Sequence, residues 1–323
     1  MFAGLTPPML VGLTPNVQIA LAGVFAILAA SSVALAAARR LVAVVDLSDL
    51  RLRVRSWWVM VVVLCLAALL GRNVSLLFLA LLSFLALKEY LSFIPARRAD
   101  RGVFLCAYAA IPIQYYLIAS ERYELFSVFA PLYALFVLPA GLLAGGETRG
   151  YLRAAGTLAF GVLATVYAIG HLGYLLVLPV SGNPLGGGVG LAVYLVFLVQ
   201  FNDVAQYLFG KWLGRRKAAP AISPNKTLEG LIGGLLVTLV LAVALAPWLT
   251  PLNNVEAAAA GLLIGVSGFA GDLMMSAIKR DIGVKDTGAM LPGHGGILDR
   301  LDSLIFAAPL FFHFLRQLHY SGG

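Results

Sequence analysis

The chain has 323 residues, of which 61% are hydrophobic and 12% are charged, and its formal net charge is +8. Soluble domains carry about 25% charged residues, so this composition excludes a protein built of ordinary soluble domains and indicates an integral membrane protein. In such a protein a basic balance is typical of loops that meet anionic lipid headgroups on one side of the bilayer. We therefore expect membrane lipids, and no nucleic acid, among its partners.

Long apolar runs predict about ten (nine to ten) transmembrane helices, because each crossing takes about 20 residues. The predicted spans are 17–38, 56–70, 73–87, 103–119, 125–145, 153–180, 188–210, 229–249, 255–278 and 303–316. The predicted fold class is thus an all-α, polytopic membrane helix bundle. Since polar residues concentrate toward the C-terminal end, we expect residues 1–200 to form a transmembrane scaffold. Residues 201–323 would form the catalytic region with its cytoplasmic loops, within one integrated membrane domain.

The basic residues divide unequally between the two sides of the predicted bundle. With the N-terminus outside, all but three of the 23 Lys and Arg residues fall in loops on the inside, the exceptions being Arg72, Arg122 and Arg316. Cytoplasmic loops carry an excess of Lys and Arg, so this partition supports ten spans and cytoplasmic loops at 211–227 and 279–302. We expect a protein of the bacterial cytoplasmic (inner) membrane whose active site faces the cytoplasm.

A first polar cluster lies inside the seventh predicted span, where Asn202, Asp203 and Gln206 fall within about one helical turn. A charged residue at the centre of a spanning helix costs about 2.5–3.5 kcal/mol on insertion scales. This cost favours a functional role for Asp203 facing a cavity of the bundle. The alternative is a patch of hydrogen bonds between helices.

A second motif runs from Ser223 to Gly230, with the sequence SPNKTLEG. Ser223 suits a helix N-cap and Pro224 the first helical position, so the motif predicts a helix start. Such a start binds phosphate readily, and Lys226 and Thr227 in its first turn would meet phosphate oxygens. The alternative is a capped helix start with a lysine that reaches the membrane interface.

The third motif spans residues 271–302 and is the most informative. Asp272 and Ser276 are four residues apart, so they face the same side of the ninth predicted span. Asp299 and Asp302 are three apart at the start of the tenth. Between these helices lies a loop rich in Gly and Pro, which lets backbone approach a ligand closely.

These acids are accompanied by basic residues, which is the composition that phosphoryl or nucleotidyl transfer requires. Carboxylates are the ligands that Mg²⁺ prefers, usually one or two together with substrate phosphates. Such chemistry depends mainly on positioning and charge neutralisation. The alternative is a solvated charged loop in which the acids pair with the arginines. Asp272 inside an apolar span disfavours that alternative.

Residues 276–302 fill every fixed position of the pattern S-x-x-K-R-x4-K-D-x-G, then L-P-x-H-G-G-x-x-D-R-x-D. This segment resembles the signature of the phosphatidate cytidylyltransferase (CDP-diacylglycerol synthase) family, and the similarity covers about residues 200–305. The resemblance implies transfer of CMP from CTP to phosphatidic acid, giving CDP-diacylglycerol and pyrophosphate. It further implies Mg²⁺, with a second cation associated with the site, and a homodimer.

The resemblance also assigns roles to residues. The catalytic residues would be Asp203, Lys226, Lys279, Arg280, Lys285 and Arg300. The substrate-binding residues would be Asn202, Ser223, Thr227, Ser276, Asp286, His294, Gly295 and Gly296. The metal ligands would be Asp272, Asp299 and Asp302.

One feature departs from the family pattern, because Asn202 precedes Asp203. This leaves the chemistry intact and leaves open a different lipid phosphate acceptor, such as an ether or isoprenoid lipid. A distant alternative is a membrane transporter that uses Asp203 and Asp272 as ion carriers. It requires acids near the midplane with access from both sides, whereas the sequence places them toward the cytoplasmic ends.

Overall fold

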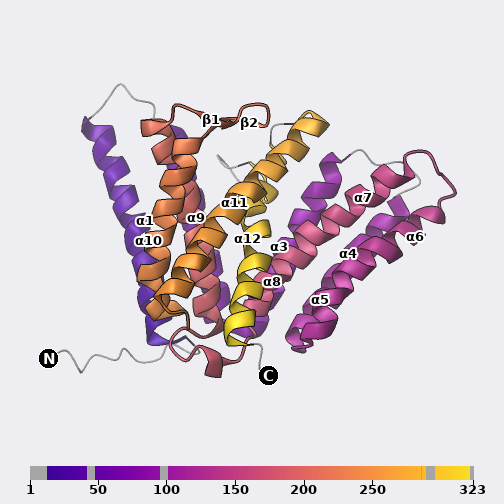
Figure 1. Ribbon diagram of the computed structural model, residues 1–323, viewed down its shortest axis with the longest axis horizontal. Helices are drawn as coiled ribbons and strands as arrows, with labels where there is room; N and C mark the ends of the chain where they lie inside the picture. The colour runs from indigo at the N-terminus through magenta and orange to yellow at the C-terminus, as the bar shows by residue number, and fades with distance from the viewer. Residues whose placement is uncertain (1–12, 42–47, 95–100, 285, 289–294, 321–323) are drawn as a thin grey trace.

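The computed structural model describes residues 13–41, 48–94, 101–284, 286–288 and 295–320. Within these ranges the chain forms ten helical rods, which confirms the predicted all-α membrane bundle (Figure 1). Eight of the described helices are long and apolar enough to cross a membrane. The other two rods are α2, whose apolar part is the shorter stretch Val54–Leu69, and α12.

The rods follow the predicted spans: most extend beyond the predicted ends, whereas the second, fifth and sixth end earlier than predicted. The first four are α1 (Pro15–Leu41), α2 (Ser48–Leu69), α3 (Arg72–Phe93) and α4 (Arg101–Ala119). Two rods each contain a π-helical turn: α5 (Tyr123–Leu132), η2 (Tyr133–Val137) and α6 (Leu138–Leu143), then α7 (Tyr151–Val162), η3 (Leu163–Tyr167) and α8 (Ala168–Leu175). After the 3-10 turn η4 (Val180–Gly182) come α9 (Gly187–Leu213), α10 (Leu228–Leu249), α11 (Asn254–Ile282) and α12 (Leu298–His319).

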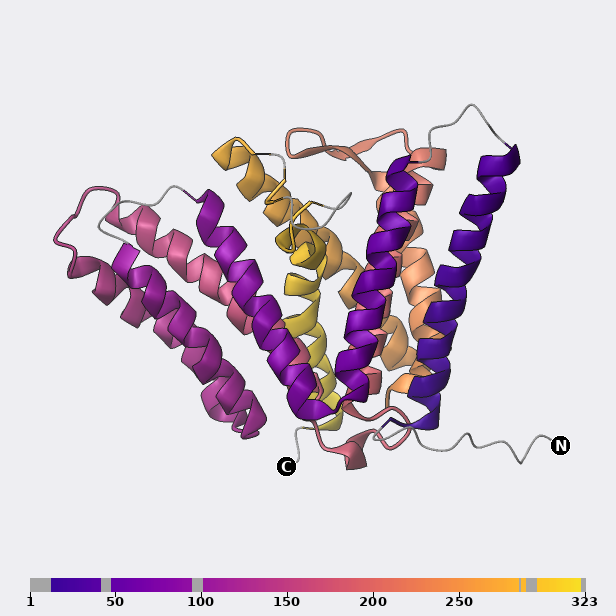
Figure 2. The same ribbon diagram turned by 180° about the vertical axis from the view of Figure 1, so that it is seen from behind.

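The centre of the bundle is formed by α9 to α12, which pack on one another, with α8 and α3 also against α12. In Figures 1 and 2, α1 and α2 flank one side of this centre and α4 to α7 lie on the other. Helices α11 and α12 approach closely at Gly271, where a Cβ would overlap the backbone oxygen of Asp302. The glycine therefore brings the acid-bearing turns of both helices together.

The predicted helix start at Ser223 is wrong. Ser223–Thr227 is strand β2, which pairs antiparallel with β1 (Lys217–Ala219). Helix α10 begins at Leu228, and its N-cap is Thr227, whose Oγ1 accepts from the Gly230 N–H at 3.1 Å. Proline is tolerated in an edge strand, so strand pairing overrides the local N-cap signal.

The hairpin lies across one end of the bundle, near the end of α9, the start of α10 and the end of α11 (Figure 1). Both ends of the described chain lie toward the opposite end of the bundle. The Glu229 carboxylate accepts backbone N–H bonds from Arg215 at 3.0 Å and from Arg216 at 3.1 Å, which closes the root of the hairpin. The described parts of the loops predicted to be basic and cytoplasmic lie at this same end of the molecule.

Candidate active site

Asp272 on α11 is the centre of the first group of polar contacts. Its Oδ2 lies 2.5 Å from the Lys226 ammonium of β2, and its Oδ1 accepts from Ser276 Oγ at 3.2 Å. The Lys226 ammonium also lies 4.6 Å from the centroid of the Phe269 ring. The side chains of Lys226 and Asp272 remain 17% and 28% exposed. The hairpin therefore places the Lys226 ammonium beside the partly buried Asp272 carboxylate, which a ligand can still reach.

Two further acids face this pair from neighbouring helices. Asp203 on α9 accepts from Ser303 Oγ at 3.2 Å, and Asp302 on α12 accepts from the Ser303 backbone N–H at 2.7 Å. The carboxylates of Asp203, Asp272 and Asp302 repel one another electrostatically, while Lys226 offsets part of this repulsion at Asp203. Three helices thus bring acidic groups together in one place, an arrangement that a nearby cation stabilises.

Asp299 makes a different set of contacts, although it is only three residues from Asp302. Its Oδ1 lies 2.7 Å from the Lys279 ammonium, and its Oδ2 accepts from the backbone N–H of Thr287 at 3.0 Å and of Gly296 at 3.1 Å. Oδ1 is therefore paired with α11, and Oδ2 with the two ends of the loop that joins α11 and α12. These contacts make Asp299 an organiser of the loop, and its metal role stays a prediction.

We expect Asp299→Asn to lower stability strongly. The side chains of Lys279 and Asp299 are only 11% and 6% exposed, and breaking a buried pair by removing one partner costs about 3–5 kcal/mol. Thermal unfolding of the purified variant in detergent checks this. Asp281→Asn on α11 is the control, because the side chains of its 3.9 Å pair with Arg153 are 78% and 70% exposed. Equal melting temperatures of the two variants would contradict the role given to Asp299.

Glu89 at the end of α3 is a site residue that the sequence reasoning missed. It is buried, and its carboxylate accepts from the Thr287 hydroxyl, from the Ile297 N–H at 2.8 Å and from the Leu298 N–H at 3.1 Å. The third predicted span ended at residue 87, so Glu89 fell just outside the predicted helices. The only signal in the sequence was an acid directly followed by an apolar run.

Asn202 and Thr227, both predicted to bind substrate, have partners within the protein. Asn202 is fully buried, donates to the Gly265 carbonyl at 3.2 Å and accepts from the Thr238 hydroxyl at 3.1 Å. It therefore joins α9, α10 and α11, which is the interhelical alternative considered for this cluster. Thr227 is also buried, and its hydroxyl caps α10. In both cases a local partner uses the polar group.

Arg280, Ser223 and Asp286 are predicted site residues that lie in the hairpin, at the end of α11 or just after it. Arg280 is exposed, and its guanidinium donates to the carbonyls of Ile222 and Val284 at 3.4 Å, which ties the hairpin to α11. Ser223 is in β2, and Asp286 is exposed beside Gly295. The predicted residues Lys285 and His294 lie outside the described residues.

Gly296 serves packing within the protein. A Cβ at this position would overlap the Glu89 carboxylate and the Thr287 hydroxyl. The glycine is therefore explained by the close approach of Glu89. A close approach of backbone to a ligand, as the sequence reasoning assumed, is not needed to account for it.

Arg300 follows Asp299 in the first turn of α12. Its Nε is buried and has no hydrogen-bond partner within the described part of the chain, and its charge acts on Asp203. Buried donors are normally paired. An unpaired guanidinium donor beside a group of acids suits an anionic ligand such as a phosphate.

The carboxylate oxygens of the site are the candidate ligands for the predicted Mg²⁺. Among the described residues, no group of three or more His, Cys, Asp or Glu would by itself hold a metal ion. Mg²⁺ usually takes only one or two carboxylates and completes its shell with water and substrate phosphates. Asp272 and Asp302, with Asp203 nearby, supply hard oxygen donors of this kind. They fit the ion, and its binding here stays a prediction.

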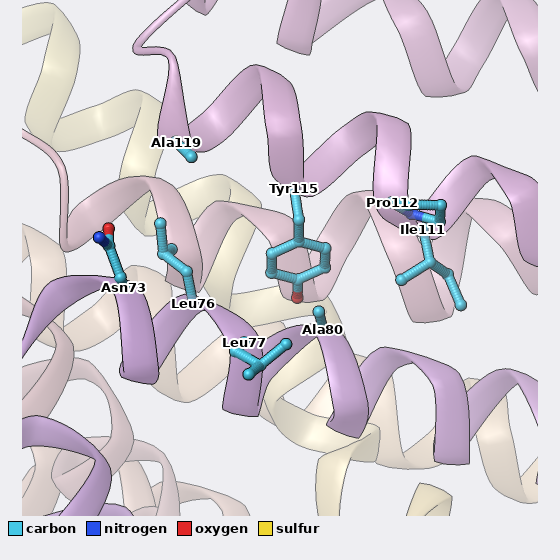
Figure 3. A pocket seen from close by; sticks show the side chains of 8 residues that line it. All are labelled: Asn73, Leu76, Leu77, Ala80, Ile111, Pro112, Tyr115 and Ala119. Carbon is cyan, nitrogen blue, oxygen red and sulfur yellow. The ribbon is translucent and has the colours of Figure 1, made fainter. Parts of the chain in front are cut away.

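A cavity of about 370 Å³ lies elsewhere, between α3 and α4 (Figure 3). Its lining residues are Asn73, Leu76, Leu77, Ala80, Ile111, Pro112, Tyr115 and Ala119. This lining is mostly apolar and lies toward the start of α3, whereas Glu89 lies near the end of that helix. The cavity therefore does not belong to the site of the acids.

Comparison with known proteins agrees with the chemistry of this site. The model of a family described as the cytidylyltransferase family matches residues 51–318. The chain belongs to this cytidylyltransferase family. The match covers α2 to α12 almost completely, so the family includes the N-terminal helices that supply Glu89 as well as the hairpin and the acids. The protein is accordingly a nucleotidyltransferase of the membrane.

Two kinds of relative are similar to the chain. The uncharacterized protein YnbB of Escherichia coli is 47% identical over 272 residues, which cover 84% of this chain and 89% of YnbB. A phosphatidate cytidylyltransferase of Staphylococcus aureus is 45% identical over 124 residues, 38% of this chain and 48% of the relative. One of Synechocystis is 48% identical over 116 residues, 35% and 39% of the two chains. The aligned part thus spans half or less of the length of these two enzymes.

Proposed function

We propose that the protein transfers CMP from CTP to phosphatidic acid, giving CDP-diacylglycerol and pyrophosphate for phospholipid synthesis. The observation that carries this proposal is the convergence of Asp203, Asp272 and Asp302 from three helices, at a point where the Lys226 ammonium lies 2.5 Å from Asp272. Opposite charges at a partly accessible point within a membrane bundle suit a reaction between two phosphates, one of which belongs to a lipid. The names of the Staphylococcus and Synechocystis relatives support phosphatidic acid as the acceptor.

In this reaction an oxygen of the lipid phosphate attacks the α-phosphorus of CTP. The new P–O bond forms as the bond to the β-phosphate breaks, and pyrophosphate leaves with the electron pair. The lipid phosphate is already ionised near neutral pH, so the site needs no strong general base. Lys226, Lys279 and Arg300 hold and neutralise phosphate oxygens, and the loop organised by Asp299 fixes the start of α12 that carries Arg300.

Asp272 and Asp302 would hold Mg²⁺ in this mechanism. An ion held there would supply charge neutralisation for the phosphates and for the departing pyrophosphate. A second cation, expected from the family resemblance, would use the remaining negative charge near Asp203. The homodimer expected from the same resemblance also remains a prediction, which the molar mass of the detergent-solubilised protein checks.

The proposal also specifies which lipid phosphate accepts CMP. The sequence reason for an unusual acceptor was Asn202, but this side chain is buried and bonded to α10 and α11. Its polar groups contact the protein itself, so Asn202 gives no support to an unusual acceptor. Phosphatidic acid is preferred over ether and isoprenoid lipid phosphates on the names of the relatives.

The direct test incubates purified protein with labelled CTP, Mg²⁺ and a panel of lipid phosphates, followed by identification of the labelled lipid. We expect label in CDP-diacylglycerol when phosphatidic acid is supplied. Label in another CDP-lipid alone would keep the cytidylyl transfer and change the acceptor. No labelled lipid from any acceptor would refute the proposed reaction. The transporter alternative would then be tested by ion flux in liposomes.

We also propose that the site faces the cytoplasm, since CTP is found there and the basic loops share the end that carries the hairpin. In a background with Cys65 and Cys106 replaced by Ser, Ala221→Cys in the hairpin should react only with a membrane-permeant reagent in intact cells. The exposed Ser181→Cys near η4, at the other end of the bundle, should react with an impermeant reagent. Labelling of Ala221→Cys by the impermeant reagent would overturn this orientation.

A further inference from the structure

The start of α12 is an unusual helix N-terminus, because a residue far away in the sequence accepts the hydrogen bonds of its first backbone N–H groups. The first N–H groups of a helix lack partners within the helix. At α12 the N-cap residue is Ile297, which forms no side-chain cap among the described residues. Glu89 takes this role from α3, since its Oε2 accepts the Ile297 N–H at 2.8 Å and its Oε1 the Leu298 N–H at 3.1 Å.

The same carboxylate also holds the other end of the loop. Glu89 accepts from the hydroxyl of Thr287, whose backbone N–H in turn donates to Asp299 at 3.0 Å. Glu89 and Asp299 thus bind the loop from two sides, one from the scaffold and one from α12 itself. A negative charge at a helix N-terminus is also favourable to the helix dipole. The turn that carries Arg300 and leads to Asp302 is therefore fixed by a residue of the scaffold.

We propose that Glu89 is a positioning residue for cytidylyl transfer, which holds the first turn of α12 in the orientation that places Arg300 and Asp302. It does not touch the reacting phosphates. Its loss would leave Asp302 and Arg300 present but misplaced relative to Asp272 on α11. The expected loss of activity rests on the proposed function. The expected change in the first turn of α12 rests on the geometry alone.

The test compares Glu89→Gln with Glu256→Gln in the purified full-length protein. Glu256 is a matched control because it also caps a helix, in the capping box of α11 with Asn253, and it pairs with His319 at 3.0 Å at the opposite end of the bundle. Replacing a residue that holds a metal ligand or catalytic group in place typically lowers metal affinity or activity 10–100-fold. For Glu89→Gln we expect a loss of about that size in kcat/KM for CTP. We also expect a higher Mg²⁺ midpoint, which is the Mg²⁺ concentration that gives half-maximal activity. Glu256→Gln should change only the melting temperature.

Two further variants keep the proposal testable if Glu89→Gln does not fold. Glu89→Asp retains the charge on a shorter side chain, so it should recover part of the lost activity. Thr287→Ala removes one of the three donors and leaves the carboxylate intact, so it should raise the Mg²⁺ midpoint by less than Glu89→Gln. Wild-type values for both variants would contradict the proposal.

Hydrogen–deuterium exchange gives a readout that does not depend on turnover. The amides of Ile297 and Leu298 should exchange faster in Glu89→Gln than in the wild type, and at the wild-type rate in Glu256→Gln. Unchanged exchange, or faster exchange with unchanged kcat, KM and Mg²⁺ midpoint, would overturn the positioning role. A wild-type protein that transfers no CMP, while exchange responds as expected, would instead refute the proposed function.

Discussion

Asp302→Asn and Asp272→Asn should each reduce CMP transfer by roughly 100-fold or more, the loss seen when a single charge-stabilising group is removed from a catalytic site. Each substitution keeps the shape of the side chain and removes one of the charges that converge between α9, α11 and α12. The residual activity should require more Mg²⁺, with a midpoint raised at least about tenfold. Mg²⁺ titrations of labelled CMP transfer measure both effects.

The alternative is that these acids only pair with basic residues such as Lys226. It predicts a less stable protein whose residual activity keeps the wild-type Mg²⁺ midpoint. Thermal unfolding measured beside each titration separates the two models, with Asp281→Asn as a control on the exposed end of α11. If Asp272→Asn and Asp302→Asn both stay active at an unshifted midpoint, the metal assignment is wrong.

Lys226→Met should lower kcat/KM for CTP by about 10²–10³-fold, in the range for loss of one preorganised donor. Methionine preserves an apolar side chain beside the Phe269 ring and removes the ammonium that lies 2.5 Å from Asp272. Because Lys226 is in β2, which contributes no helix of the bundle, we expect the melting temperature to change little. Steady-state kinetics with CTP and lipid varied separately show which phosphate the ammonium serves.

The main competing explanation is that Lys226 only neutralises the acids. In that case additional Mg²⁺ would replace it and restore the rate, whereas a phosphate-binding role predicts no such rescue. Lys217→Met is the matched control, since Lys217 is exposed on β1 of the same hairpin and pairs with Thr227 of β2. A loss in Lys217→Met equal to that in Lys226→Met would indicate a general effect of hairpin charge.

Some features of the site followed from spacing within a single helix. Asp272 and Ser276 were expected on one face of a helix because they are four residues apart, and their side chains are hydrogen-bonded. The same reasoning was less successful for Asp299 and Asp302. They share the start of α12, but Asp299 binds Lys279 and the loop, whereas Asp302 lies toward the acids of α9 and α11. Spacing places side chains on a helix but does not identify their partners on other helices.

The sequence by itself determined the membrane character of this protein, the approximate helices and the residue types of the site, because these depend on local composition and period. Only the tertiary structure decided that Ser223–Thr227 pairs as a strand and that Lys226 meets Asp272. It also decided that Glu89 caps a helix 208 positions away. Such contacts depend on how helices approach one another, which is set by packing at positions such as Gly271 and not by any local pattern.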